Sequence, residues 1–515
     1  PNLAAITTRS LPALRAFLEG ERAGLEGRWD AAGDAYARAM SADSTFWLAV
    51  FRYAFARWWY LEAVDDDIVK AVRTHSYALP ERDRMVFESW VTDTMPLALA
   101  RARDVVTRYP DYWPGWMQHG DWLFHAGPVY GFERAEGKAA LERTVELNPT
   151  LIPAWEHLFW ASMPDDTVTA ARAVAALERL GFGKTAAAEF GFDIGRVYRF
   201  DLAMRRSGMF EEPLRDSIVV DLVTAARGRL GGGTTWAPAQ IALSERVLAS
   251  RPRPELAAIH EFVMADAWAS RGAWDKALAI AERYARRPTG VDPLYAYRMA
   301  VIGAWLGALS PELVERQRTV PARASETSSW NAMRRAELAW LDGLHAVTLL
   351  DTAALRAARD RLRLADTVST PLLDRTLGAF ESELMGERQL AARTLAVTNW
   401  PNPDMLVPGY GAHPYVIAIS RLAAARWLIA EGDTAEAKRL LMWFDATWAF
   451  DGYRPARRIL GPLAALERAR IAEAQQQSDY ALRSYSEFLL EYDAPVPAHR
   501  QLVDEARAAL AKLGR

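Results

Sequence analysis

The segment from residue 27 to residue 39 reads Gly27-Arg28-Trp29-Asp30-Ala31-Ala32-Gly33-Asp34-Ala35-Tyr36-Ala37-Arg38-Ala39, a glycine followed by a helix-forming stretch. The glycine stands five residues before an alanine, and this spacing returns three times further along the chain. The later copies are Gly272 to Leu278, Gly386 to Ala391 and Gly432 to Ala437. Glycine accepts the backbone conformation of a tight turn, and small residues let two helices approach closely. This repetition predicts a chain assembled from similar helical hairpins.

The rest of the sequence favours an all-helical chain. Apolar residues recur at three- and four-residue spacing, as in Ala98, Ala102 and Val105, and no stretch alternates convincingly with the period of a strand. A fifth copy of the pattern keeps Ala481 and Tyr485 but lacks the glycine. Because a single hairpin cannot bury its apolar face alone, we expect neighbouring hairpins to stack and share a core.

The segment Gly27 to Ala39 resembles the second helix of a tetratricopeptide repeat, with Ala32, Tyr36 and Ala39 at the small, bulky and small packing positions. The two ends of the chain, Thr8 to Glu21 and Ser484 to Leu489, are similar to the ends of the tetratricopeptide regions that follow kinase or DNA-binding domains in certain bacterial regulators. The resemblance implies an all-α, right-handed superhelical solenoid of helical hairpins. It also implies a sensor or interaction region.

Three segments are expected along the chain. Residues 1–165 hold N-terminal repeats, and residues 236–515 hold C-terminal repeats with a capping helix. Residues 166–235 fit the repeat pattern poorly and end in a glycine-rich break at Gly228 to Thr235, where we place a boundary.

The composition excludes several kinds of site and partner. The 515 residues include no cysteine, so a disulfide, a catalytic thiol and a thiolate zinc site are excluded. A formal charge of −3 provides no broad positive field for nucleic acid. The longest apolar run, Met299 to Leu309, has 11 residues and is too short to span a bilayer. Since the chain begins at Pro1 without a leader, we expect a processed protein or a fragment of a longer bacterial protein, and leave the compartment open between cytoplasm and periplasm.

Tryptophan is unusually frequent, with 20 copies, and it guides the prediction of a binding surface. In tetratricopeptide arrays the first helix of each hairpin lines the concave face, and the register set from Gly27 places the next first helix at about residues 47–60. The predicted groove residues are Phe51, Phe55, Trp58, Trp59, Met117, Asp121, Phe124, His125, Glu156 and Trp160. An aromatic strip edged by polar groups suits an extended peptide, a partner helix or a sugar chain. The alternative is that these aromatic residues belong to the core, since a register error of one residue would bury them.

No motif points to catalysis or to a cofactor. The eight histidines are scattered, none lies four residues from another, and no His-Glu-x-x-His motif is present, so neither a metal site nor a cofactor is predicted. Gly181 to Thr185 lacks the earlier glycine of a phosphate-binding loop, and no Gly-x-Ser-x-Gly motif occurs. The triplet Asp65 to Asp67 predicts the start of a helix, where carboxylates interact favourably with the helix dipole.

The sequence therefore predicts a non-catalytic scaffold or sensor region that binds a protein or peptide, or else a small ligand or glycan. Two alternatives stay open. An α/α-toroid enzyme acting on carbohydrate would be a closed ring of helices with two carboxylates near its centre. A structural subunit of a larger complex would carry an additional apolar face on its convex side.

Overall fold

A computed structural model of the chain describes residues 8–59, 65–92, 94–162, 166–181, 236–287, 292–325, 332–365, 367, 370–396, 413–445 and 454–514. These residues form 24 α-helices and a few short 3₁₀ turns, and none of them forms a strand. The predicted all-α class is confirmed. The glycine-rich break at residues 228–235 and most of the segment 166–235 lie outside the described residues.

The chain divides into two compact units, which are described separately. The first unit comprises residues 1–127 and 132–190. Its helices are α1 (Leu11–Leu25), α2 (Trp29–Ala42), α3 (Trp47–Trp59), α4 (Asp66–Thr74), α5 (Glu81–Trp90), α6 (Met95–Arg108), α7 (Trp113–Ala126), α8 (Arg134–Leu147), α9 (Ile152–Ser162) and α10 (Thr167–Arg179). As predicted, the aspartate triplet starts a helix: the Asp65 side chain accepts the amide hydrogen of Asp67 at the beginning of α4.

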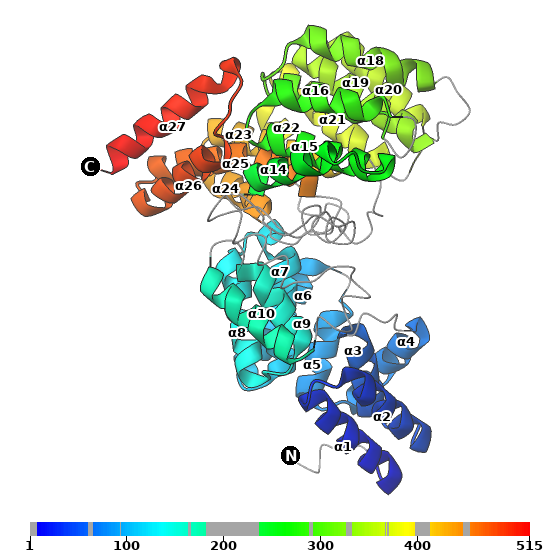
Figure 1. The fold of residues 1–515 in the computed structure, drawn as a ribbon. Coiled ribbons are helices and arrows are strands. Elements are labelled where there is room, and N and C mark those ends of the chain that lie inside the picture. Colours follow the sequence, from blue (N-terminus) through cyan, green and yellow to red (C-terminus); the bar gives the residue numbers. More distant parts are fainter. Residues whose placement is uncertain are drawn as a thin grey trace. The chain divides into compact units, whose positions relative to one another are not determined.

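The second unit comprises residues 128–131 and 191–515. Its helices are α14 (Trp236–Ala249), α15 (Pro254–Ser270), α16 (Trp274–Ala285), α17 (Tyr295–Trp305), α18 (Pro311–Ser325), α19 (Ala332–Thr348), α20 (Thr352–Leu364), α21 (Thr370–Leu384), α22 (Arg388–Leu395), α23 (His413–Ala430), α24 (Thr434–Met442), α25 (Arg454–Ala474), α26 (Ser478–Glu491) and α27 (Arg500–Leu513). Within each unit, helices that follow one another in sequence pack as adjacent pairs (Figure 1).

The predicted turn glycines lie where one helix ends and the next begins. The φ angles of Gly27, Gly272, Gly386 and Gly432 lie between 76° and 86°, the left-handed region that favours glycine. The amide after each glycine donates to the carbonyl five residues earlier, at 2.8–3.0 Å, which is the hydrogen bond of a Schellman helix end. The alanine five residues after each glycine is fully buried. The hairpins predicted at these four places are therefore present.

The fifth copy forms the same turn without glycine. Gln476 stands five residues before the buried Ala481 and has a φ of 58°, and the amide of Gln477 donates to the carbonyl of Ala472 at 2.9 Å. The position therefore holds a side chain in a backbone region that costs a non-glycine residue about 1 kcal/mol or more.

Replacing Gln476 by glycine is expected to raise the free energy of unfolding by about 1 kcal/mol, because the left-handed strain is relieved. The matched reverse change is Gly432→Gln, which introduces the same strain at an equivalent turn and should destabilise the chain by a similar amount. Urea denaturation followed by circular dichroism measures both. Equal midpoints for the wild type and both variants would contradict this account of the turns.

In the second unit, helices that lie far apart in the sequence pack against one another. The odd-numbered helices from α17 to α25 each contact the next odd-numbered helix, and α25 also packs against α15. The segment after α26 completes this contact, since the amides of Ala494 and Val496 donate to the carbonyls of Arg271 and Gly272, both at 2.9 Å. In a simple solenoid each repeat contacts only its neighbours, so the pairing of α15 with α25 is a departure from that expectation.

Candidate functional site

The structure buries most of the aromatic residues predicted to line a groove. Phe51 and Phe55 of α3 are almost fully inaccessible to solvent, and the Phe51 ring meets the Phe87 ring edge-on at 5.9 Å. Trp58 is 45% exposed, with its ring centroid 5.4 Å from that of Trp90. The side chain of Trp59 lies outside the described residues. The prediction of an open aromatic strip on α3 is therefore wrong for Phe51 and Phe55.

The same correction applies to the later helices. Met117, Phe124 and Trp160 are buried, so they too belong to the core. For Met117 and Phe124, the reason is that α7 contacts four other helices, α5, α6, α8 and α9, and this leaves it little free surface. Trp160 lies on α9, which packs against α7, α8 and α10. A helix enclosed in this way buries apolar residues around most of its circumference, so apolar character alone does not identify a groove.

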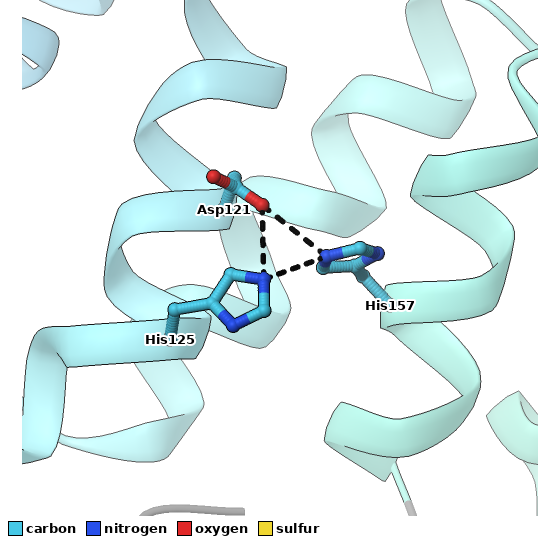
Figure 2. A group of neighbouring side chains, drawn as sticks. All are labelled: Asp121, His125 and His157. Carbon is cyan, nitrogen blue, oxygen red and sulfur yellow. Dashed lines mark hydrogen bonds and ion pairs between the residues drawn. The ribbon is translucent and has the colours of Figure 1, made fainter. Parts of the chain in front are cut away.

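The polar residues predicted at the edge of the groove do come together. Asp121, His125 and Glu156 meet His157 between α7 and α9, and Figure 2 shows three of the four. The Nε2 atoms of His125 and His157 lie 3.0 Å apart, and each lies 3.2 Å from Oδ1 of Asp121. One carboxylate oxygen and two imidazole nitrogens thus form a nearly equilateral triangle.

Local structure explains the positions. Asp121 and His125 are four residues apart on α7, so they share one face of the helix. His157 lies on α9, which packs against α7. The Phe124 ring covers both imidazoles, with centroid distances of 5.1 Å to His125 and 4.9 Å to His157. The side chains of Asp121, His125 and His157 are 9%, 17% and 13% exposed, so the triangle is shielded from most solvent.

The other ring nitrogen of His157, Nδ1, also has interaction partners. This atom lies 2.8 Å from the carbonyl oxygen of Pro153 and 2.9 Å from Oε2 of Glu156. The indole of Trp160 donates to the other carboxylate oxygen of Glu156. His157 is therefore oriented by its surroundings as well as by the triangle.

The cluster is electrostatically coupled. Burial, the largest effect, disfavours a charged His157, but hydrogen bonds to Asp121 and Glu156 outweigh it and raise the pKa of His157 to about 10. Burial also disfavours a charged Asp121, yet His125 and His157 outweigh this and hold the pKa of Asp121 well below its usual range. The two imidazoles therefore stabilise the ionised form of Asp121.

A second buried polar cluster lies in the second unit. The Nε atom of Arg298 donates to Oε1 of Glu337 at 2.8 Å, and one of its terminal nitrogens donates to Oδ2 of Asp292 at 2.7 Å. Its guanidinium carbon lies 5.3 Å from the centre of the Tyr415 ring. Nearby, the Tyr295 hydroxyl donates to Oδ1 of Asp266 at 2.7 Å. The carboxyl groups of Asp266 on α15 and Glu337 on α19 are thus among those buried in this unit.

Burial raises the pKa of Asp266 from 3.8 to about 7 and that of Glu337 to about 7, in the latter case against the opposing effect of Arg298. A raised folded-state pKa means that the folded protein binds the proton more tightly than the unfolded chain. The stability contribution of Asp266 is therefore largest at low pH and falls as the pH rises from about 4 to about 7.

Asp266→Asn removes this titration while keeping an acceptor for the Tyr295 hydroxyl. Relative to the wild type, the variant should gain stability between about pH 4 and about pH 7, by at most about 1.4 kcal/mol per pH unit, and the difference should level off above that window. Urea denaturation of both proteins across the pH range measures the difference. The exposed control, Asp275→Asn, should show no such slope, and parallel profiles for all three proteins would contradict the assignment.

Comparison with protein-family models finds no match for this chain, and comparison with curated proteins finds none either. Within the described part of the chain, no helix combines the length and the apolar character needed to cross a membrane.

Proposed function

We propose that this chain is a non-catalytic binding scaffold of tetratricopeptide-like helical hairpins, comparable with the sensor or interaction regions of bacterial regulators. The observation that carries the proposal is the recurring hairpin unit. A left-handed turn residue, a Schellman hydrogen bond and a buried alanine five residues later occur together in both units. Repeated hairpins of this kind present long surfaces whose side chains can vary without disturbing the turns.

A protein or peptide is the partner class that such a surface suits best. Among the predicted groove residues with described side chains, Trp58 keeps substantial exposure, and its ring packs beside Trp90 at the end of α5. An exposed tryptophan held by a second tryptophan is a rigid apolar anchor, and anchors of this kind contribute much of the affinity at interfaces.

Selection of peptides from a display library against the full chain tests the proposal. The selected peptides should bind with an affinity that Trp58→Ala lowers about tenfold or more, while circular dichroism shows unchanged helix content. Tyr77→Ala is the matched control, because Tyr77 is also an exposed aromatic residue of the first unit but lies outside α3. Failure to select any peptide, or equal losses in the two variants, would count against a peptide-binding role for this surface.

A second candidate function is favoured by two observations in the second unit. The contact between α15 and α25 and the burial of Asp266 and Glu337 agree with two features expected of an α/α-toroid enzyme, a returning ring of helices and a pair of internal carboxyl groups. Release of reducing ends from a panel of polysaccharides would support this candidate, provided that Asp266→Asn and Glu337→Gln each abolish it and remain folded. Turnover would also overturn the non-catalytic proposal.

A further inference from the structure

We propose that Asp121, His125 and His157 bind a divalent transition-metal ion in the first unit. Each of the three residues presents one ligand atom. Within the described part of the chain, these three ligand atoms lie close enough to one another to hold a metal ion. This goes beyond a scaffold role, and it replaces the sequence-based expectation that the chain binds no metal.

The spacing of the ligand atoms fits a metal ion. Zn²⁺ bonds to imidazole nitrogen and carboxylate oxygen at about 2.0–2.2 Å, so two ligand atoms of a tetrahedral ion lie about 3.3 Å apart. The three distances here are 3.0, 3.2 and 3.2 Å. Figure 2 shows Nε2 of each ring and one oxygen of Asp121 turned toward a common point. An ion above this triangle would bond to all three atoms with little movement of the side chains.

The hydrogen bond on the far side of His157 selects the tautomer that binds metal. A backbone carbonyl can only accept, so the Nδ1 atom that lies 2.8 Å from the Pro153 oxygen carries the proton. A metal ion that displaces the proton from Nε2 then meets a lone pair directed into the triangle. Glu156 lies beside the same Nδ1 atom, at 2.9 Å, and supplies the carboxylate that often accompanies a metal-binding histidine.

The donor set indicates the class of ion. Two imidazole nitrogens and one carboxylate oxygen suit Zn²⁺ and its neighbours in the first transition row, whereas Mg²⁺ and Ca²⁺ prefer ligands that are all oxygen. The competing occupant is a proton, which would let a charged His157 donate to Asp121 without any metal. Titration with a metal separates the two cases, because only the first gives stoichiometric binding.

Binding would also link two hairpins. Asp121 and His125 come from α7 and His157 from α9, so an ion shared by them joins helices on either side of α8. An ion that binds only the folded state stabilises it by mass action, so added Zn²⁺ should raise the melting temperature of the chain.

The test is calorimetric titration of the full chain, first treated with a chelator, with Zn²⁺ as the probe and Mg²⁺ as the negative control. The wild type should bind one Zn²⁺ per chain at this site. His157→Gln should weaken binding more than 100-fold, and Glu156→Gln should weaken it about 10- to 100-fold through loss of support for the ring. His119→Gln is the matched control, because His119 is a buried histidine on the same helix outside the triangle, and it should bind like the wild type.

A folded wild-type chain that binds no Zn²⁺ would overturn the proposal and would leave a hydrogen-bonded proton as the occupant. Equal affinity of the wild type and His157→Gln would also overturn it, since the ion would then lie elsewhere. If circular dichroism shows that His157→Gln is unfolded, Glu156→Gln decides the question, because its side chain lies outside the triangle. In that case wild-type affinity in Glu156→Gln would count against the site.

Discussion

Replacing Arg298 by alanine is expected to lower the free energy of unfolding by about 3–5 kcal/mol, because it leaves the buried carboxylate of Glu337 without its positive partner. Arg298 is 3% exposed and binds Glu337 and Asp292 in the second unit. Glu337 is itself buried, so water cannot take the place of the guanidinium. Urea denaturation of the full chain measures the loss as a lower midpoint of the transition that includes this unit.

A matched double variant separates the lost charge partner from lost packing. Glu337→Gln removes the charge that Arg298 would otherwise leave unpaired, so Arg298→Ala combined with Glu337→Gln should be less destabilising than the two single effects added together. The exposed pair of Arg507 with Asp504 is the control, and Arg507→Ala should cost less than about 1 kcal/mol. A loss that small for Arg298→Ala would show that this buried pair contributes no more than a surface pair.

Asp83→Ala is expected to have a comparable effect on the first unit, about 3–5 kcal/mol. Asp83 is almost completely buried, and its Oδ1 atom lies 2.8 Å from a terminal nitrogen of Arg52. The hydroxyl of Tyr112 donates to the same oxygen at 2.6 Å. Removal of the carboxylate therefore leaves a buried guanidinium with less compensation and a buried hydroxyl without its acceptor.

The conservative variant tests the cause of this loss. Asp83→Asn keeps an acceptor for the Tyr112 hydroxyl but removes the negative charge beside Arg52, so its effect should fall between those of the wild type and Asp83→Ala. Asp34→Asn is the matched control, because Asp34 pairs with Arg57 at an exposed position of the same unit. Equal stabilities for Asp83→Ala and the wild type would mean that other groups compensate the charge of Arg52. The contacts of Asp83 with Arg52 and Tyr112 would then have no stabilising role.

The turns could be predicted from the sequence because the constraint is local. A left-handed backbone conformation at a helix end favours glycine, and the small side chain of the alanine five residues later lets the next helix approach closely. The fifth turn was recognised without a glycine because Ala481 and Tyr485 keep their packing positions. Its left-handed residue, Gln476, could not be identified from its residue type.

The burial of the predicted groove residues could not be predicted from the sequence, because the burial of a helix depends on how many other helices surround it. The register assigns Phe51, Phe124 and Trp160, on three different helices, to one exposed strip, but neighbouring helices cover all three side chains. The contact between α15 and α25 joins segments far apart in the chain and has no local signature.

The sequence did not indicate the cluster of Asp121, His125 and His157, because no two histidines lie four residues apart. Here the pair four residues apart is Asp121 with His125, and the third residue is 32 positions further along, on another helix. The sequence signal of this cluster is a carboxylate and a histidine on one helical face, with a second histidine on a helix one hairpin away.

The most direct measurement is a crystal structure of the full chain grown with Zn²⁺, with diffraction data collected on both sides of the zinc absorption edge. We expect an anomalous peak about 2.0–2.2 Å from Nε2 of His125, Nε2 of His157 and an oxygen of Asp121. No peak at this position, with the two imidazoles and the carboxylate still at hydrogen-bonding distance, would contradict it.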